Sequence, residues 1–152
     1  MPRPRGQEEK QVLAAYLTEH RLKRSEQREF ILDEFLKAKR HVSVDELLRL
    51  VQRRRPDIGH TTIYRTLKLL REAGLAAELQ IGTETRYEAD YKRAHHDHFM
   101  CKYCGEIFEF ASDEIERIQD EFAAEIGFAI EGHRHHIYGR CRNCSQKAPR
   151  SH

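Results

Sequence analysis

The chain has 152 residues, of which 34% are charged, and its formal net charge is +2. The charge is unevenly divided, because residues 1–93 carry 20 basic and 15 acidic side chains whereas residues 94–152 carry 7 and 10. The basic part favours a polyanionic partner, and the acidic part, which holds seven of the ten histidines, favours cations. No apolar run approaches the roughly 18 residues that span a bilayer, so we expect a cytoplasmic protein with no membrane partner.

Apolar residues at helical spacing predict four helices in the basic part. They are expected over residues 8–20, from a Ser25 cap onward, from a Ser43 cap to about Arg55, and from Thr61 or Thr62 to Ala73. Gly74 is expected at the C-cap of the fourth helix. Two extended segments, 75–80 and 85–87, surround Gly82 and predict a small hairpin.

Three helices, a turn to a fourth helix and a terminal hairpin describe a winged helix-turn-helix, whose fourth helix enters the major groove of double-stranded DNA. The first turns of that helix carry the expected base-contacting residues, which are Thr61, Thr62, Tyr64, Arg65 and Lys68. Basic residues around the start of the second helix are placed to meet the phosphate backbone, namely Lys23, Arg24 and Arg28. The basic part is therefore predicted to bind DNA.

All four cysteines occur in Cys-x-x-Cys pairs, Cys101 with Cys104 and Cys141 with Cys144. Two such pairs supply the tetrahedral sulfur shell that structural zinc prefers. The alternatives are a disulfide framework, which needs an oxidising compartment, and a redox dithiol, which needs only one pair. We expect a Zn²⁺ ion that stabilises the fold and has no open coordination position for chemistry.

A strand is predicted from His95 to Met100, leading into the first cysteine pair. Side chains alternate along a strand, so His96 and His98 would face one way and His95 and Asp97 the other. This short run is thus expected to contribute ligands to two separate metal sites, whose imidazole and carboxylate donors suit Fe(II), Mn(II), Zn(II) and Co(II).

The rest of the acidic part predicts a small mixed sheet with one helix. Strands are expected at 107–110, 128–131 and 135–140, and the helix from a Ser112 cap to Gly127, with Ile115, Ile118, Phe122 and Ile126 turned inward. Such a sheet is too small to be stable alone, so we expect it to continue across a homodimer. The fold class is α+β, with a winged-helix domain over 1–88, a hinge over 89–94 and a metal-binding dimerisation domain over 95–152.

Several motifs together resemble the ferric uptake regulator (Fur) family, from about Leu13 to Cys144. They are His41-Val42-Ser43, Thr62-Ile63-Tyr64-Arg65, Arg86-Tyr87-Glu88, His95-His96-Asp97-His98-Phe99, Cys-x-x-Cys-Gly and Tyr138-Gly139 before the last cysteine pair. The resemblance implies that Tyr64 and Arg65 read the major groove and that Lys23 enters the minor groove.

The resemblance also implies two metal sites besides the cysteines. A regulatory site between the domains would use His41, Glu88, His96, His98 and Glu109, and a second site in the dimerisation domain would use His95, Asp97, Glu116 and His133. Asp90 is an alternative to Glu88, because the segment from Glu88 to His96 is one residue longer than in some relatives. His135 and His136 are additional histidines that the pattern does not require.

The implied function is a metal-dependent repressor that binds palindromic operators, with Fe(II) control of iron uptake genes as the leading interpretation. Sensing of zinc or manganese stays open, as does sensing of peroxide, although peroxide sensors typically have aspartate where this chain has Glu109. A zinc metallohydrolase is disfavoured, because His-His-Asp-His lacks the His-Glu-x-x-His of zinc proteases and the His-x-Glu of deaminases. A four-cysteine adaptor module would leave the helix-turn-helix unexplained. We therefore expect no enzymatic activity.

Overall fold

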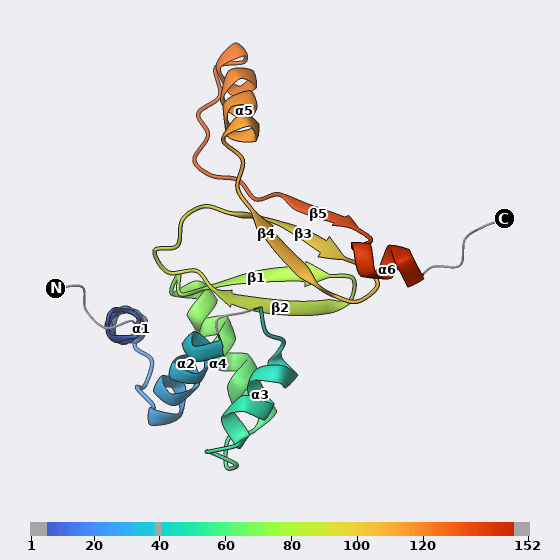
Figure 1. Cartoon of the computed structure of the whole chain (residues 1–152). Helices are drawn as coiled ribbons and strands as arrows, with labels where there is room; N and C mark the ends of the chain where they lie inside the picture. Colours follow the sequence, from blue (N-terminus) through green and yellow to red (C-terminus); the bar gives the residue numbers. More distant parts are fainter. Residues whose placement is uncertain (1–5, 39–40, 148–152) are drawn as a thin grey trace. The chain divides into compact units, whose positions relative to one another are not determined.

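The computed structural model describes residues 6–38 and 41–147, and the chain divides into two compact units, Met1–Arg93 and Ala94–His152 (Figure 1). The division falls inside the segment 89–94 that the sequence suggested as a hinge, and Ala89 itself belongs to a strand of the first unit. No helix among the described residues is long and apolar enough to cross a membrane.

The first unit has the predicted order of four helices followed by a hairpin. Its elements are α1 (Gln7–Glu19), α2 (Glu26–Ala38), α3 (Val44–Gln52), α4 (His60–Glu72), β1 (Ala76–Ile81) and β2 (Glu84–Ala89). The two strands pair antiparallel, and Gly82 takes a left-handed φ of 60° in the turn between them. The helix ends differ slightly from expectation, because α3 stops at Gln52, before Arg55, and α4 begins at His60, before Thr61.

Local signals in the sequence fix the ends of α3 and α4. At α3 the predicted capping box is present, because Glu46 N–H donates to Ser43 Oγ over 3.2 Å and Ser43 N–H donates to Glu46 Oε2 over 3.0 Å. The C-cap of α4 is Ala73, so Gly74, which was expected at the C-cap, lies one residue beyond it. Its φ of 73° allows the N–H of Leu75 to close the helix by donating to an α4 carbonyl.

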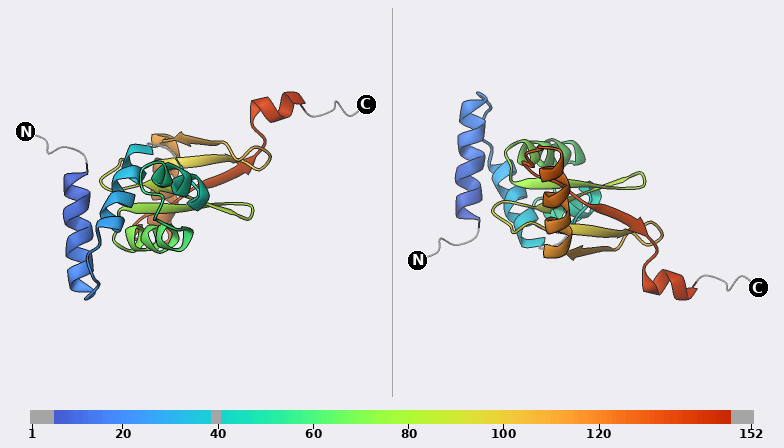
Figure 2. Two further views of the ribbon diagram at one scale, coloured as in Figure 1. Left: turned by 90° about the horizontal axis from the view of Figure 1, so that it is seen from below. Right: turned by 90° about the horizontal axis from the view of Figure 1, so that it is seen from above.

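The hydrophobic core of the first unit lies among α1 to α4 and the hairpin. Both views in Figure 2 show α1 beside α2. The buried side chains include the predicted α2 stripe of Ile31, Leu32, Phe35 and Leu36, together with Ile63, Leu67 and Leu70 of α4. This core holds α4 with its opposite face available to a ligand.

The second unit is a three-stranded mixed sheet with two helices. Its elements are β3 (Asp97–Cys101), β4 (Ile107–Phe110), α5 (Asp113–Glu125), β5 (His136–Gly139) and α6 (Arg142–Lys147). The strand order is β4-β3-β5, with β4 antiparallel and β5 parallel to β3. The predicted strand at 128–131 was wrong, since those residues form no regular element, and the short helix α6 was not foreseen.

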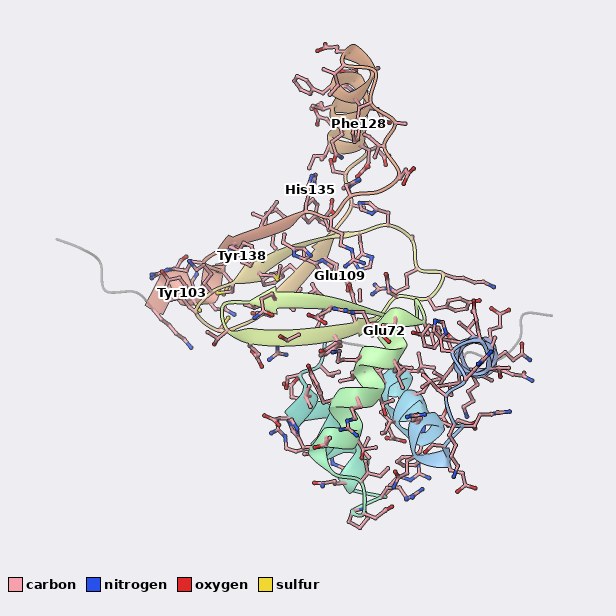
Figure 3. The ribbon with its side chains drawn as sticks, turned by 180° about the vertical axis from the view of Figure 1, so that it is seen from behind. Glu72, Tyr103, Glu109, Phe128, His135 and Tyr138 are labelled. Carbon is pink, nitrogen blue, oxygen red and sulfur yellow. The ribbon has the colours of Figure 1, made fainter. Side chains whose placement is uncertain are left out.

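The predicted inward stripe of α5 was also wrong for a single chain. Ile118 is 39% exposed, Phe122 66% and Ile126 79%. The helix is capped by Ser112 as expected, but it projects away from the sheet, and the exposed Phe128 lies beside it away from the strands (Figures 1 and 3). Helical spacing identified the apolar face correctly but does not say which molecule covers it. A contiguous exposed apolar stripe is typical of an interaction surface.

Candidate metal centres and DNA interface

The four cysteine sulfurs of the second unit converge on one point. All four cysteines are free thiols, their Sγ atoms all lie within 4.8 Å of one another, and the Sγ atoms of Cys104 and Cys141 are 3.7 Å apart. Zinc–sulfur bonds of about 2.3 Å at tetrahedral angles place two sulfurs about 3.8 Å apart. The donors and their spacing therefore fit a closed structural zinc site.

The parallel pairing of β3 with β5 brings the two cysteine pairs together. Cys101 ends β3 opposite Gly139, the last residue of β5, and Cys141 lies two residues after Gly139. The N–H of Cys141 donates to the sulfur of Cys101 over 3.4 Å and, with the N–H of Cys104, lowers the pKa of the Cys101 thiol to about 6. Burial raises the pKa of Cys144 to about 12. Four thiolates at this spacing need a cation to balance their charge.

A second group of donors lies between the start of β3, the first turn of α5 and the segment before β5. Donor atoms of His95, Asp97, Glu116 and His133 all lie within 4.8 Å of one another. Nε2 of His95 is 3.4 Å from both Asp97 Oδ1 and Glu116 Oε1, and Nε2 of His133 is 3.1 Å from Glu116 Oε1. Two imidazoles and two carboxylates thus surround one position.

Three of these atoms are buried without a hydrogen bond to any described residue: Asp97 Oδ2, Glu116 Oε1 and His133 Nε2. Buried polar atoms that lie close together without hydrogen bonds are costly, and a cation between them would satisfy all three. Burial raises the pKa of Asp97, but the His135 N–H at 3.0 Å and the nearby imidazoles outweigh it and lower the pKa overall. The Asp97 carboxylate is therefore ionised and suited to bind a divalent metal.

The residues implied for the regulatory site form two local groups, one in each unit. In the first unit, His41 Nε2 lies 3.0 Å from Glu88 Oε2. In the second, His98 and Glu109 are paired across β3 and β4, and His96 Nε2 lies 3.9 Å from Glu109 Oε1. The rings of His96 and His98 are 4.9 Å apart.

The predicted alternation along His95–His98 is seen in these contacts. His96 and His98 fall in one group and His95 and Asp97 in the other, although the strand begins only at Asp97. Of the two additional histidines, His135 contacts Asp97 Oδ2 at 3.3 Å, and the ring of His136 lies 5.7 Å from that of His98. Asp90 accompanies Glu88 in the first unit, where its N–H donates to Leu75 O.

Two arginines to which the sequence reasoning gave no role contact the predicted ligands of the first unit. Arg86 donates to the carbonyl of His41 over 3.3 Å and to Glu46 Oε2 over 3.2 Å, so it connects β2 to the segment that caps α3. Arg93 donates to Glu88 Oε2 over 2.9 Å. Arg86 stood in the Arg86-Tyr87-Glu88 motif without an assigned role, and the sequence signal for Arg93 was its proximity to Glu88.

Several of the expected DNA-contacting residues line a hollow at the surface of the first unit. Lys23, Arg24, Arg28, Arg55, Thr62 and Arg65 are among the residues that line it. Tyr64 is 44% exposed on α4, and Thr61 and Arg65 are also exposed. Arg28 donates to the carbonyl of Lys23 over 2.5 Å, so it orders the Lys23 loop as well as adding charge. The hollow beside the start of α4 is thus lined by five basic side chains, and whether it contacts DNA stays a prediction.

Comparisons with known proteins identify similar sequences and structures. The model of the ferric uptake regulator family matches residues 19–146. The ferric uptake regulation protein of Campylobacter jejuni is 38% identical over 130 residues, which are 84% of this chain and 83% of that protein. The peroxide operon regulator of Bacillus subtilis is 31% identical over 121 residues, 80% of this chain and 83% of that protein. The structure of the Helicobacter pylori ferric uptake regulator, described as having three functional metal binding sites, superposes with a TM-score of 0.86 at 26% identity, covering 98% of this chain and 99% of that one.

Proposed function

We propose an iron-responsive repressor role for this chain from the premise that it belongs to the ferric uptake regulator family. Members of this family are metal-responsive transcriptional regulators that bind DNA as dimers, and they are not enzymes. Fe(II) is the proposed signal because the Campylobacter jejuni relative is a ferric uptake regulation protein. The peroxide operon regulator of Bacillus subtilis supports peroxide sensing as a second candidate, which Glu109 in place of aspartate disfavours.

The proposed DNA-binding mode uses α4 as the recognition helix. Thr61, Thr62, Tyr64 and Arg65 would face the bases, while Lys23 and Arg28 would hold the backbone. A symmetric dimer presents two such helices, so the operator would be palindromic, with half-sites spaced to match them. The basic hollow beside α4 supports this mode.

The proposed switch is a cation bound by His41 and Glu88 together with His96, His98 and Glu109, with Asp90 as the alternative to Glu88. The observation that carries this proposal is the anchoring of His41. The next residue, Val42, pairs with Tyr87 of β2 through two backbone hydrogen bonds, and Ser43 then caps α3. A cation on His41 would therefore act on the hairpin and α3 at once, and fix the DNA-binding domain relative to the dimerisation domain.

The other two metal sites are proposed to support this switch. Zn²⁺ in the four-cysteine site would hold β3, β5 and α6 together, and a divalent cation would satisfy the unpaired atoms around Asp97 and Glu116. We place the protein in the cytoplasm, where thiols stay reduced and available to zinc.

Metal-dependent operator binding of His41→Ala tests the proposed switch. Mn(II), as an air-stable substitute for Fe(II), is titrated into each variant in the presence of labelled operator. We expect His41→Ala to remain a folded, zinc-loaded dimer but to lose most of the metal-induced gain in affinity, a factor of about 5 to 150 for a typical allosteric link. The matched variant His133→Ala alters the other site and should reduce activation less. Equal activation of wild type and His41→Ala would exclude this site as the switch.

A further inference from the structure

The carboxylate of Glu88 already binds a cation that the chain itself supplies. Nη1 of Arg93 lies 2.9 Å from Oε2 of Glu88, and the same oxygen lies 3.0 Å from Nε2 of His41. The Glu88 side chain is 4% exposed, whereas that of Arg93 is 31% exposed. The guanidinium therefore contacts the oxygen that the proposed function assigns to the regulatory metal.

A defined turn, rather than chance contact, delivers Arg93 to this position. The N–H of Asp90 donates to Leu75 O over 3.1 Å, and the N–H of Arg93 donates to Asp90 O over 3.4 Å. Between them, Lys92 takes a left-handed φ of 53° and its ammonium lies 2.7 Å from Glu8 of α1. A left-handed lysine costs of order 1 kcal/mol and persists where surrounding contacts impose it. The whole turn belongs to the first unit.

The electrostatics make the guanidinium and a metal mutually exclusive partners of Glu88. A buried carboxylate needs a positive partner, and Arg93 supplies one when no metal is bound. A divalent cation at the same oxygen would repel the guanidinium strongly, because both charges would share a poorly solvated position. Arg93 is partly exposed and has a flexible stem, so its charged end can move into water when the metal arrives.

We propose, on the basis of the function proposed above, that Arg93 is an internal competitor of the regulatory cation and sets the metal concentration at which the regulator switches. Metal binding displaces the guanidinium from Glu88. Because Arg93 ends the turn that leads out of the first unit, its release also frees the end of that turn. Arg93 thereby raises the metal threshold without touching DNA.

The test compares Arg93→Gln with Lys92→Gln. Both remove one positive charge from the same turn, but Lys92 pairs with Glu8 and not with Glu88. Mn(II) is titrated in the presence of labelled operator, and Mn(II) binding without DNA is measured by equilibrium dialysis. We expect the Mn(II) concentration at the midpoint to fall about tenfold for Arg93→Gln in both measurements, which is within the range of allosteric coupling factors. For Lys92→Gln the midpoint should stay at the wild-type value. Operator affinity at saturating Mn(II) should be unchanged in both variants.

Three outcomes would overturn the proposal. An unchanged or higher midpoint for Arg93→Gln would mean that Arg93 does not compete, and equal shifts for Lys92→Gln would reduce the effect to net charge. Weaker operator binding of Arg93→Gln at saturating Mn(II) would make Arg93 a phosphate contact instead. If Arg93→Gln fails to fold, Arg93→Lys replaces it in the test. Lysine keeps the positive charge but lacks the planar guanidinium, so it should lower the Mn(II) midpoint by less than Arg93→Gln. An unchanged Mn(II) midpoint for Arg93→Lys would then refute the proposal.

A double variant separates this inference from the function on which it rests. If His41→Ala abolishes activation and also removes the effect of Arg93→Gln, both substitutions act at one site, as proposed. If His41→Ala activates normally, the switch itself is wrongly assigned. If His41→Ala abolishes activation but Arg93→Gln alone changes nothing, the switch stands and only the competition is refuted.

Discussion

Loss of the structural zinc should unfold the second unit and leave the first one folded. The perturbation is Cys141→Ser, which removes one of the four sulfur ligands. Among the described residues, the buried apolar side chains of the second unit are Met100, Cys101 and Ala123, whereas the first unit has a cluster of buried residues from all four helices. A fully buried methionine contributes about 1.5–3 kcal/mol, but a structural zinc contributes apparent binding free energies of about 10–16 kcal/mol in small domains. The metal is therefore expected to dominate the stability of this unit.

Hydrogen exchange and sedimentation test the prediction that Cys141→Ser unfolds the second unit. In Cys141→Ser the amides of Met100 and Ile137, in paired strands, should lose protection, while those of Ile31 and Leu67 should keep it. The protein should lose zinc and sediment as a monomer, because the exposed face of α5 would no longer be held in place. Ser145→Ala, next to Cys144 on α6, is the matched control and should behave as wild type. A zinc-free dimer with protected strand amides would refute the reasoning.

Three further predictions concern the DNA-binding face, the dimer and the α3 cap. Arg65→Ala should change which operator sequences are recovered in a selection of bound DNA fragments. Lys23→Ala should weaken binding to all duplexes alike and reduce the slope of log affinity against log salt concentration by about one. Identical sequence profiles for the two variants would contradict the assignment. Phe122→Glu should dissociate the dimer in sedimentation while keeping the zinc content, and an intact dimer would show that the α5 stripe is not the interface. Ser43→Ala should lower the unfolding free energy of the first unit by about 1 kcal/mol in a denaturant titration, because the Glu46 N–H loses its acceptor.

The parts of the fold that could be predicted were those set by local chemistry. Ser43 and Glu46 indicate a helix start, because their side chains form hydrogen bonds with each other's backbone N–H groups. Gly74 indicates a helix end, because a left-handed backbone conformation there favours glycine. The prediction of a strand at 128–131 was wrong, because a strand also needs a neighbouring strand to form backbone hydrogen bonds, and apolar residues alone do not supply one. The prediction that α5 buries its apolar face was wrong for a related reason, because helical spacing identifies an apolar face without identifying what covers it.

The candidate metal sites were predictable to the extent that their ligands follow one another in sequence. Because side chains alternate along a strand, the order of residues from His95 to His98 predicts which of the two ligand groups each side chain joins, and the contacts agree with that division. Arg93 and Arg86 could not be found in this way. Their importance depends on which oxygen each one reaches, and that is decided by the turn after β2 and by the pairing of Val42 with Tyr87.

Competition at Glu88 also constrains how metal and DNA influence each other. Coupling between two binding sites is reciprocal, so an operator that favours the metal-bound arrangement must raise metal affinity by the factor by which metal raises operator affinity. Arg93 enters this cycle only on the metal-free side, where its guanidinium occupies the carboxylate. Its removal should therefore shift the metal midpoint by the same factor with and without operator, and leave the coupling factor itself unchanged. A substitution at His41 should instead reduce the coupling factor, because His41 is the proposed ligand that precedes the capped start of α3.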